Sequence, residues 1–323
     1  MKKTTLAELA RLAECSLSQA SRAITGNGPV APQLRNRIRA FAIQYGYRNL
    51  SNNHHPKIAI LCSKNFGSHE SYLIRAIMEK TEKRNWNCMI CTHDNLSLVR
   101  ELFIDGVIFI GHDNDYFAAN WPLHSSLPLV MVNNFGNPLE DISEIRPDQD
   151  DEYRLILEHF HSLGHRRIAR LLRTPPDASE RQNNNGNTPF FRQAGVLGLV
   201  DVESLVFHEE NELPVHISAL LKKGFTAFLI VNQHLTLLAI HTFAMLGKRI
   251  PEDVSIMGYE VEWVSEYLNP PLTTIDFDYD ELARLALCKL AELMRHQPLT
   301  QEGKLIRVPN KLHIRASTGL VHS

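Results

Sequence analysis

Long apolar runs, clustered cysteines and an excess of charge of one sign are all missing from this 323-residue sequence. Its apolar stretches, such as Val107–Ile110 and Ala227–Val231, fall far short of the roughly 20 residues that a membrane-spanning helix needs. Five scattered cysteines, an odd number, exclude a disulfide scaffold and indicate reduced thiols. Hydrophobic residues at 44% and charged residues at 22% exclude disordered and collagen-like chains.

A secretory signal peptide is also missing, because Glu8, Arg11 and Glu14 interrupt the apolar core that such a peptide would have. The sequence therefore predicts a protein of the cytoplasm. Its length suggests two to three domains at a prior of roughly 150 residues each.

Charge is distributed unevenly, although the whole chain carries only −2. The first 50 residues hold eight basic and two acidic side chains, a net charge of +6, and the remainder carries −8. A small basic head, here the first 50 residues, on an acidic body indicates that the head binds a polyanion. A solvated helical face is the plainer explanation, and the order of helices in the head has to decide between the two.

The head reads as three helices. An apolar stripe at i, i+3, i+4 and i+7 predicts a first helix over residues 5–13, and Thr5 with Glu8 forms a capping-box pattern at its start. Ser16 with Gln19 repeats that pattern and opens a second helix, which ends near residue 24. Pro32 begins a third helix, and Gly46 ends it.

Two short helices separated by about three residues are typical of a helix-turn-helix, whose second helix enters the DNA major groove. Leu17, Ser18 and Arg22 are then the expected base readers: an apolar contact for a thymine methyl, a hydroxyl, and a guanidinium for guanine or phosphate. The side chains expected near the DNA backbone are Thr5, Ser16, Gln19, Ser21 and Thr25.

From residue 58 onward, apolar runs alternate with amphipathic helices, which predicts an α/β body with parallel sheets and ligands beyond the carboxyl ends of the strands. The expected strands are Ile58–Cys62, Asn87–Cys91, Gly106–Ile110, Leu129–Val132, Ile168–Leu172, Ala227–Val231 and Val254–Met257. The expected helices are Tyr72–Arg84, Asp151–Leu163, Val215–Lys222, Leu235–Leu246 and Tyr279–Arg295.

Motifs along the whole chain resemble the LacI/GalR family of bacterial transcription regulators. They are Thr5–Ala10, Ser16–Ala23 and Tyr45–Tyr47 in the head, then Leu163–Ala169, Ile250–Tyr259, Pro270–Ile275 and Val308–Gly319 in the body. In length and closing segment the chain is similar to the evolved beta-galactosidase repressor subgroup. The resemblance implies an all-α helix-turn-helix headpiece and a two-subdomain body like the periplasmic sugar-binding proteins. It also implies a homodimer that represses from a pseudo-palindromic DNA operator under a small effector, expected to be a neutral sugar.

The resemblance divides the chain into a headpiece (1–47), a linker (48–57) and a body (58–323). Within the body it assigns about 58–160 and 276–300 to a first subdomain, and about 161–275 and 301–323 to a second. The family's linker carries a hinge helix whose leucine wedges into the minor groove. Here the linker is shorter and lacks that pattern, so we expect weaker DNA affinity or a different minor-groove contact, with Leu50 as its only apolar side chain.

The resemblance also places an effector between the subdomains, where planar polar groups can bridge the hydroxyls of a sugar. The usual arginine of the family is replaced by Asn183 in an ungapped comparison, with Arg181 two residues earlier. An ordinary surface or capping role is the alternative for each residue singly. The expected effector residues are Asn133, Asp151, Arg181, Asn183, Asn232, Gln233, Glu260 and Tyr279.

Other chemistry has little support in the sequence, and we expect no metal and no cofactor. His161 and His165 have an i, i+4 spacing, but no carboxylate or cysteine completes a metal site. Cys88 and Cys91 lie on a predicted strand and point to opposite faces. No catalytic motif is present, which disfavours an enzyme, and the basic head disfavours a transport protein. The remaining alternative is a cytoplasmic sugar-binding protein with an impaired DNA reader.

Overall fold

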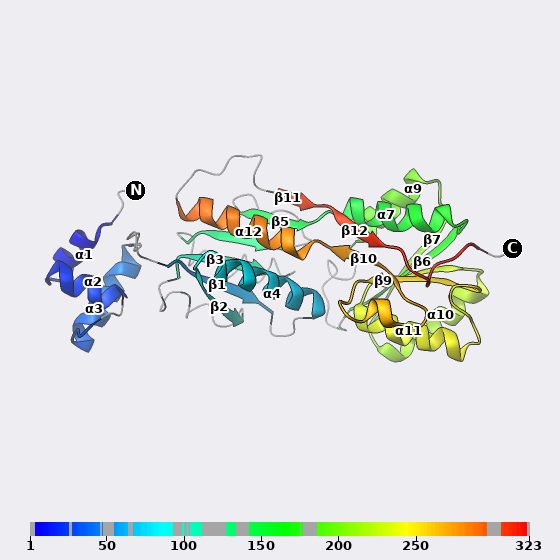
Figure 1. The fold of residues 1–323 in the computed structure, drawn as a ribbon, viewed down its shortest axis with the longest axis horizontal. Coiled ribbons are helices and arrows are strands. Elements are labelled where there is room, and N and C mark those ends of the chain that lie inside the picture. The colour runs from blue at the N-terminus through cyan, green and yellow to red at the C-terminus, as the bar shows by residue number, and fades with distance from the viewer. Residues whose placement is uncertain are drawn as a thin grey trace.

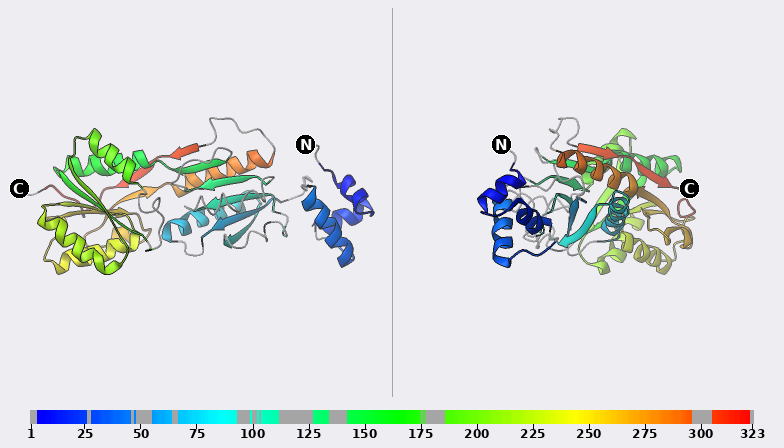
Figure 2. Two further views of the ribbon diagram at one scale, coloured as in Figure 1. Left: turned by 180° about the vertical axis from the view of Figure 1, so that it is seen from behind. Right: turned by 60° about the vertical axis from the view of Figure 1, so that its left-hand side comes forward.

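The computed structural model describes residues 4–25, 28–45, 47, 55–63, 67–92, 99, 102, 104–111, 127–133, 142–174, 176, 186–295 and 305–321. Figure 1, and Figure 2 from behind, show a small helical headpiece followed by two α/β subdomains in a row, with the headpiece and the second subdomain at opposite ends. None of the described helices is both long and apolar enough to cross a membrane.

The headpiece consists of α1 (Leu6–Leu12), α2 (Leu17–Thr25) and α3 (Pro32–Gln44), the three helices that the sequence predicts. Their inward faces are mostly alanine and branched aliphatic side chains, so the helices pack closely around a small core. The core residues are Leu9, Ala13, Ala23, Ile24, Ile38 and Ala42.

The turn between α1 and α2 is held by backbone hydrogen bonds. The Cys15 N–H donates to the carbonyl of Ala10, and the Glu14 N–H donates to that of Arg11. This is the Schellman pattern, in which the residue after the helix takes a left-handed conformation. Glu14 occupies that position with φ of 51°, where glycine would be the least strained residue.

The first subdomain contains a six-stranded sheet in the order β11-β5-β4-β3-β1-β2, with every strand pair parallel. Helix α4 (Ser68–Glu82) and helix α12 (Tyr279–Met294) pack against each other beside it. The strands are β1 (Lys57–Cys62), β2 (Asn87–Thr92), β3 (Gly106–Ile110), β4 (Leu129–Val132), β5 (Ser143–Pro147) and β11 (Leu305–Val308).

The second subdomain contains a six-stranded sheet in the order β12-β10-β9-β8-β6-β7, in which only the β10–β12 pair is antiparallel. Its strands are β6 (Arg167–Arg173), β7 (Asp201–Phe207), β8 (Ala227–Ile230), β9 (Ser255–Tyr259), β10 (Thr273–Phe277) and β12 (Asn310–His313). Its helices are α7 (Gln149–Ser162), α9 (Asn187–Val196), α10 (Leu213–Lys222) and α11 (Gln233–Met245), with short 3-10 turns at Glu210–Glu212 (η3) and Ser265–Tyr267 (η4).

The chain crosses between the subdomains three times, at Asp148, Asp278 and Pro309. Because β5 and β10 lead directly into these crossings, the carboxyl ends of both sheets face each other. The expected boundaries differ from this arrangement in two places. Residues 149–160, expected in the first subdomain, belong to α7 and pack with α9 and β12 of the second. Strand β11 joins the first sheet, although 301–323 was assigned to the second subdomain.

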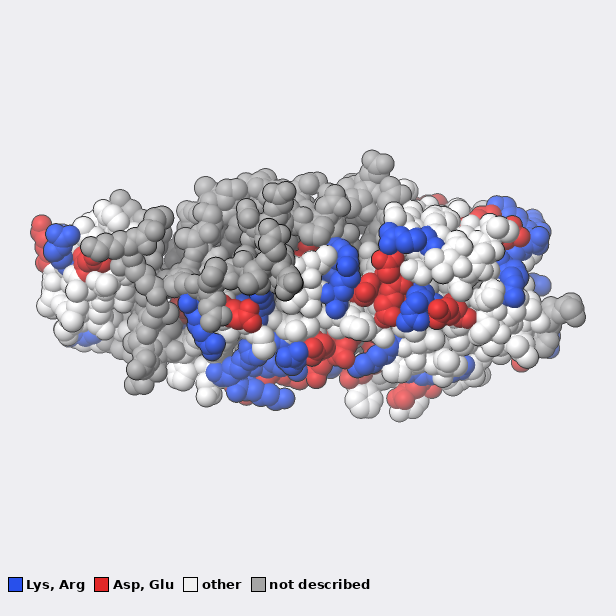
Figure 3. Space-filling model, turned by 90° about the horizontal axis from the view of Figure 1, so that it is seen from above, with Lys and Arg blue, Asp and Glu red and all other residues white. Residues whose placement is uncertain are grey.

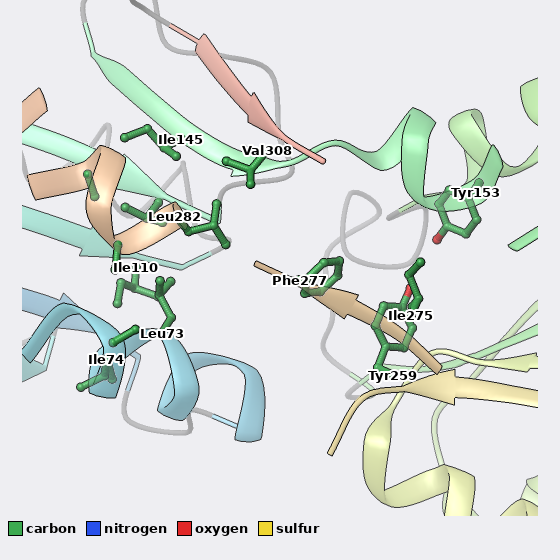
Figure 4. Packing of buried hydrophobic residues seen from close by; sticks show 14 of the residues in the cluster. Leu73, Ile74, Ile110, Ile145, Tyr153, Tyr259, Ile275, Phe277, Leu282 and Val308 are labelled. Carbon is green, nitrogen blue, oxygen red and sulfur yellow. The ribbon is translucent and has the colours of Figure 1, made fainter. Parts of the chain in front are cut away.

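One hydrophobic cluster extends through both subdomains. Figure 4 shows Phe277 between Leu282 of the first subdomain and the Tyr259–Ile275 region of the second. The expected opposite orientation of the cysteines on β2 is also observed, because Cys88 packs against this cluster and Cys91 lies in the cluster on the other face of the sheet.

Candidate DNA interface and effector site

Two capping boxes position the helices of the candidate DNA interface. The Thr5 hydroxyl accepts a hydrogen bond from the Glu8 N–H at 3.2 Å. In the second box the Gln19 N–H donates to Ser16 Oγ at 3.2 Å, and the Ser16 N–H donates to Gln19 Oε1 at 3.0 Å. Thr5, Ser16 and Gln19 thus act first as caps, which fixes where α1 and α2 begin.

The outward face of α2 carries the expected base readers. Leu17 is 55% exposed, which is unusual for a leucine, and Ser18 beside it is exposed. Arg22 lies one turn further on, half-buried, and its Nε donates to the Ser18 carbonyl at 3.2 Å. Thr25 is exposed at the end of the helix and Ser21 is half-buried, whereas Leu50 lies outside the described residues.

Two other arginines of the basic head donate hydrogen bonds to backbone carbonyls within the headpiece, which the sequence did not indicate. Arg37 of α3 donates to the carbonyl of Ala13 at the end of α1. Arg39 donates to the carbonyl of Ala23 in the last turn of α2 at 3.3 Å. Guanidinium groups at helix C-termini satisfy otherwise unpaired carbonyls and complement the helix dipole. These two arginines therefore hold the headpiece together.

On the face drawn in Figure 3, acidic and basic side chains of the described residues of the body are interspersed. Arg192 pairs with Asp150 at 2.8 Å and Lys223 pairs with Glu203 at 2.8 Å, both at the surface. Exposed pairs of this kind contribute little to stability.

Most of the described effector candidates already have partners within the chain. The Asp151 carboxylate accepts from the Asn310 N–H at 2.8 Å, which ties α7 to β12 beside a crossing. Asn232 Oδ1 accepts from the Arg173 N–H at 2.8 Å, and Gln233 Nε2 donates to the Glu260 carbonyl at 2.7 Å. Each of these contacts orders the edge of the second subdomain. Arg181 and Asn183 lie outside the described residues.

Glu260 lies at the end of β9, on the edge of the second sheet that faces the first. Arg315 Nη1 donates to its carboxylate at 2.8 Å, and the Thr274 hydroxyl donates to the same oxygen. Arg315 also donates to the carbonyl of Leu272 at 2.7 Å. The carboxylate is therefore fixed and partly neutralised, and it can still accept a hydrogen bond through its second oxygen.

Tyr279 begins α12 directly after a crossing. His69 Nδ1 and the Tyr279 hydroxyl are 2.8 Å apart, and the Tyr279 ring lies 5.6 Å from that of Tyr72. Burial raises the pKa of Tyr279 well above its ordinary value, so the phenol stays protonated. Its ring packs with those of His69, Tyr72 and Phe277 between the two subdomains.

Asn133 differs from the other candidates. It follows β4 at the carboxyl edge of the first sheet, with φ of 63°, and it is fully buried. Neither its side-chain oxygen nor its nitrogen has a hydrogen-bond partner in the part of the chain that the structure describes. A buried amide without partners is costly and suits a site where a ligand supplies them.

A buried polar cluster in the second subdomain was not predicted from the sequence. Arg170 of β6 is wholly buried, and it donates to the Tyr153 hydroxyl at 3.0 Å and to Ser204 Oγ at 2.9 Å. Beside it, the Tyr259 hydroxyl donates to the Glu152 carboxylate, and burial raises the pKa of Glu152 to about 7. The signal in the sequence is an arginine inside the apolar run Ile168–Leu172.

Gly186 lies over this cluster at the start of α9. Its φ is 75°, and a Cβ added there would lie 2.1 Å from the Tyr153 hydroxyl. Only glycine fits that approach. The cluster therefore fixes where α9 begins and, with it, one edge of the second subdomain.

Among the described residues, no group of three His, Cys, Asp or Glu side chains is arranged so that it could hold a metal ion. The histidines near the end of α7 have structural partners. His165 Nε2 lies 2.8 Å from Ser255 Oγ, and His159 Nε2 lies 2.9 Å from Thr318 Oγ1. His159 thus ties α7 to the closing segment of the chain, and His165 ties the loop after α7 to β9.

Known proteins resemble this chain over nearly its whole length. The periplasmic binding protein-like domain family matches residues 157–318. The HTH-type transcriptional repressor PurR of Photobacterium profundum is 24% identical over 97% of this chain and 98% of its own length. The HTH-type transcriptional repressor CytR of Escherichia coli K12 is 24% identical over 97% of this chain and 96% of its own.

Solved structures share the fold. The lac repressor dimer bound to operator and the anti-inducer ONPF superposes with a TM-score of 0.70 at 21% identity, covering 98% of this chain and 100% of that one. A LacI family regulator from Enterococcus faecium with bound ribose gives a TM-score of 0.67 at 24% identity, covering 82% of this chain and 100% of that one.

Proposed function

The chain belongs to the LacI/GalR family of transcription regulators, and from that membership we propose that it is a cytoplasmic homodimeric repressor under the control of a small effector. Two headpieces would occupy the half-sites of a pseudo-palindromic operator, because the symmetry of a dimer is mirrored in its DNA site. The relatives named above are regulators, and we propose no enzymatic activity for this chain.

The observation that carries the proposal is the outward face of α2. Leu17 and Ser18 are exposed there and Arg22 lies half-buried one turn further on, while the Ser16 capping box and the bond from Arg39 fix the helix on the headpiece core. A rigid helix with small, polar and cationic side chains suits major-groove readout.

Homodimerisation is supported by apolar side chains at the surface of the second subdomain. Trp263 and Tyr267, in the turn after β9, are each 73% exposed, and Leu237 on α11 is 48% exposed. Helix α11 packs on β8 and β9 and begins at the sheet edge from which that turn emerges. Large exposed aromatic groups of this kind mark protein interfaces, and a second copy of this chain is the partner that a palindromic operator requires.

For the effector we propose a neutral sugar or a similar polyol between the facing sheet edges. The unpartnered Asn133 amide and the second carboxylate oxygen of Glu260 offer donors and acceptors to hydroxyl groups. Ribose in the E. faecium regulator and cellobiose in the CelR complex give the class of ligand that this fold holds in those proteins.

The test is selection of binding sites from a random duplex pool by the full-length protein, with and without ribose or cellobiose. We expect a palindrome, whose affinity falls about five- to 150-fold in Arg22→Ala, since one bidentate base contact is typically worth about 1–3 kcal/mol. Arg249→Ala is the matched control, because it removes an exposed arginine from the second subdomain. Failure to enrich any sequence at low salt, with sugar binding intact, would favour the sugar-binding protein with an impaired reader.

A further inference from the structure

One face of α4 touches the second subdomain. His69, Tyr72 and Arg75 follow one another at intervals of three residues and lie in the first half of the helix. Because α4 begins after β1, at the carboxyl edge of the first sheet, this half of the helix lies nearest to the second subdomain. Figure 1 shows that end of α4 directed toward it, below the crossings from β5 to α7 and from β11 to β12.

The first contact is an ion pair across the junction. Arg75 Nη2 lies 2.5 Å from Glu262 Oε2, in the turn after β9, and the two side chains are 55% and 44% exposed. The Arg75 guanidinium also lies 5.5 Å from the centre of the Tyr72 ring. Arg75 therefore joins α4 to this turn, with the Tyr72 ring beside its guanidinium.

The third contact is aromatic. The His69 ring packs edge-on against Phe277 of β10, with centroids 5.0 Å apart and planes at 76°. Phe277 in turn contacts Tyr259 at 5.5 Å, deep in the second subdomain. Edge-to-face pairs at these distances are attractive. We name these five residues, His69, Tyr72 and Arg75 with Glu262 and Phe277, the α4 latch.

We propose that the α4 latch holds the two subdomains together in the absence of an effector. This inference deepens the proposed function, because it specifies how the effector site is regulated. Glu260, Asn232 and Gln233 already have partners within the chain, so this arrangement needs no ligand to satisfy them, whereas the Asn133 amide has no partner among the described residues. An effector can shift the equilibrium only by its different affinity for the two forms.

The test is a charge-reversal cycle in the full-length protein, with Arg75→Glu, Glu262→Arg and the double variant. Hydrogen exchange of the amides of Val264 and Ser265, which bond to the Val261 carbonyl, reports on the turn, and the radius of gyration from X-ray scattering reports on opening. We expect each single variant to exchange about two- to five-fold faster and to expand, as loss of an exposed ion pair allows. The double variant should return to wild-type behaviour.

The matched control reverses Lys223 and Glu203, an ion pair of 58% and 31% exposure within the second subdomain alone, and it should change neither readout. Single variants that exchange and scatter like the wild type, or a double variant that fails to restore them, would overturn the latch. Neither readout needs DNA. If the wild type enriches no operator, the repressor function fails while the cycle still decides the latch.

Discussion

The hydroxyl of Tyr259, the last residue of β9, donates a hydrogen bond to the carboxylate of Glu152 in the first turn of α7. Both groups are buried, so the pKa of Glu152 rises from its ordinary 4.5 to about 7. Arg170 nearby lowers that pKa, but burial is the larger effect. The pair couples the sheet edge that carries Glu260 to the helix that follows the first crossing.

The pKa of Glu152 gives stability a definite dependence on pH. A carboxyl whose pKa is higher in the folded state contributes stability that is fully present below pH 4.5 and is lost as the pH rises through about 7. We therefore expect Glu152→Gln to gain stability relative to wild type between pH 5 and pH 8. Urea unfolding of both proteins across this range measures the difference, and a difference that stays flat or falls would contradict the argument.

The buried histidines give stability the opposite dependence on pH. Burial lowers the pKa of His159 and His165 below their ordinary 6.5, so both are neutral in the folded protein. The unfolded chain then binds more protons as the pH falls below about 6.5, and stability is lost there. We expect His165→Asn, which keeps a polar side chain without a titrating ring, to be less stable at pH 7.5 but to lose less on acidification to pH 5.5. An unfolding free energy whose pH slope matches wild type would refute this assignment.

The turn of the headpiece offers a stabilising substitution. Glu14 has a positive φ, which costs a residue with a Cβ roughly 1 kcal/mol relative to glycine. We expect Glu14→Gly to stabilise the headpiece by about that amount, as measured by thermal unfolding of the full-length protein. Glu14→Gln, which removes the charge but keeps the Cβ, is the control, and an equal gain from both variants would show that charge, not backbone strain, is responsible.

The sequence correctly predicted the strands that apolar residues bury on both faces. Gly106–Ile110 and Leu129–Val132 form strands with the predicted bounds, because a run buried on both faces leaves a continuous apolar signal. The strand β5 was missed, since Glu144 interrupts its apolar pattern. That carboxylate is nevertheless buried, and Arg146, two residues along the same strand, pairs with it at 3.2 Å. Pairing of this kind depends on tertiary structure and is invisible in hydropathy.

In the candidate sites, too, local spacing was predictable from the sequence and contacts between distant residues were not. The outward face of α2 follows from helical spacing alone, so Leu17 and Ser18 were predicted where the structure places them. The roles of body residues depend on partners far away in the sequence. Asp151 bonds to Asn310, 159 residues away, and that contact gives it a structural role at the crossing. Residue type and position alone could not distinguish this role from a ligand contact.

Asn133 allows stability and effector binding to be separated in one experiment. Its left-handed backbone is tolerated by glycine, and its unpartnered buried amide costs the folded state free energy. We expect Asn133→Gly to unfold at the wild-type temperature or above it, and to lose the change in operator affinity that ribose or cellobiose causes in the wild type. Asn85→Gly is the matched control, because Asn85 has φ of 53° at an exposed turn outside the site. It should gain stability and keep the full sugar response. A large loss of stability in Asn133→Gly with the sugar response intact would mean that the amide serves packing, and that the effector takes its hydrogen bonds elsewhere.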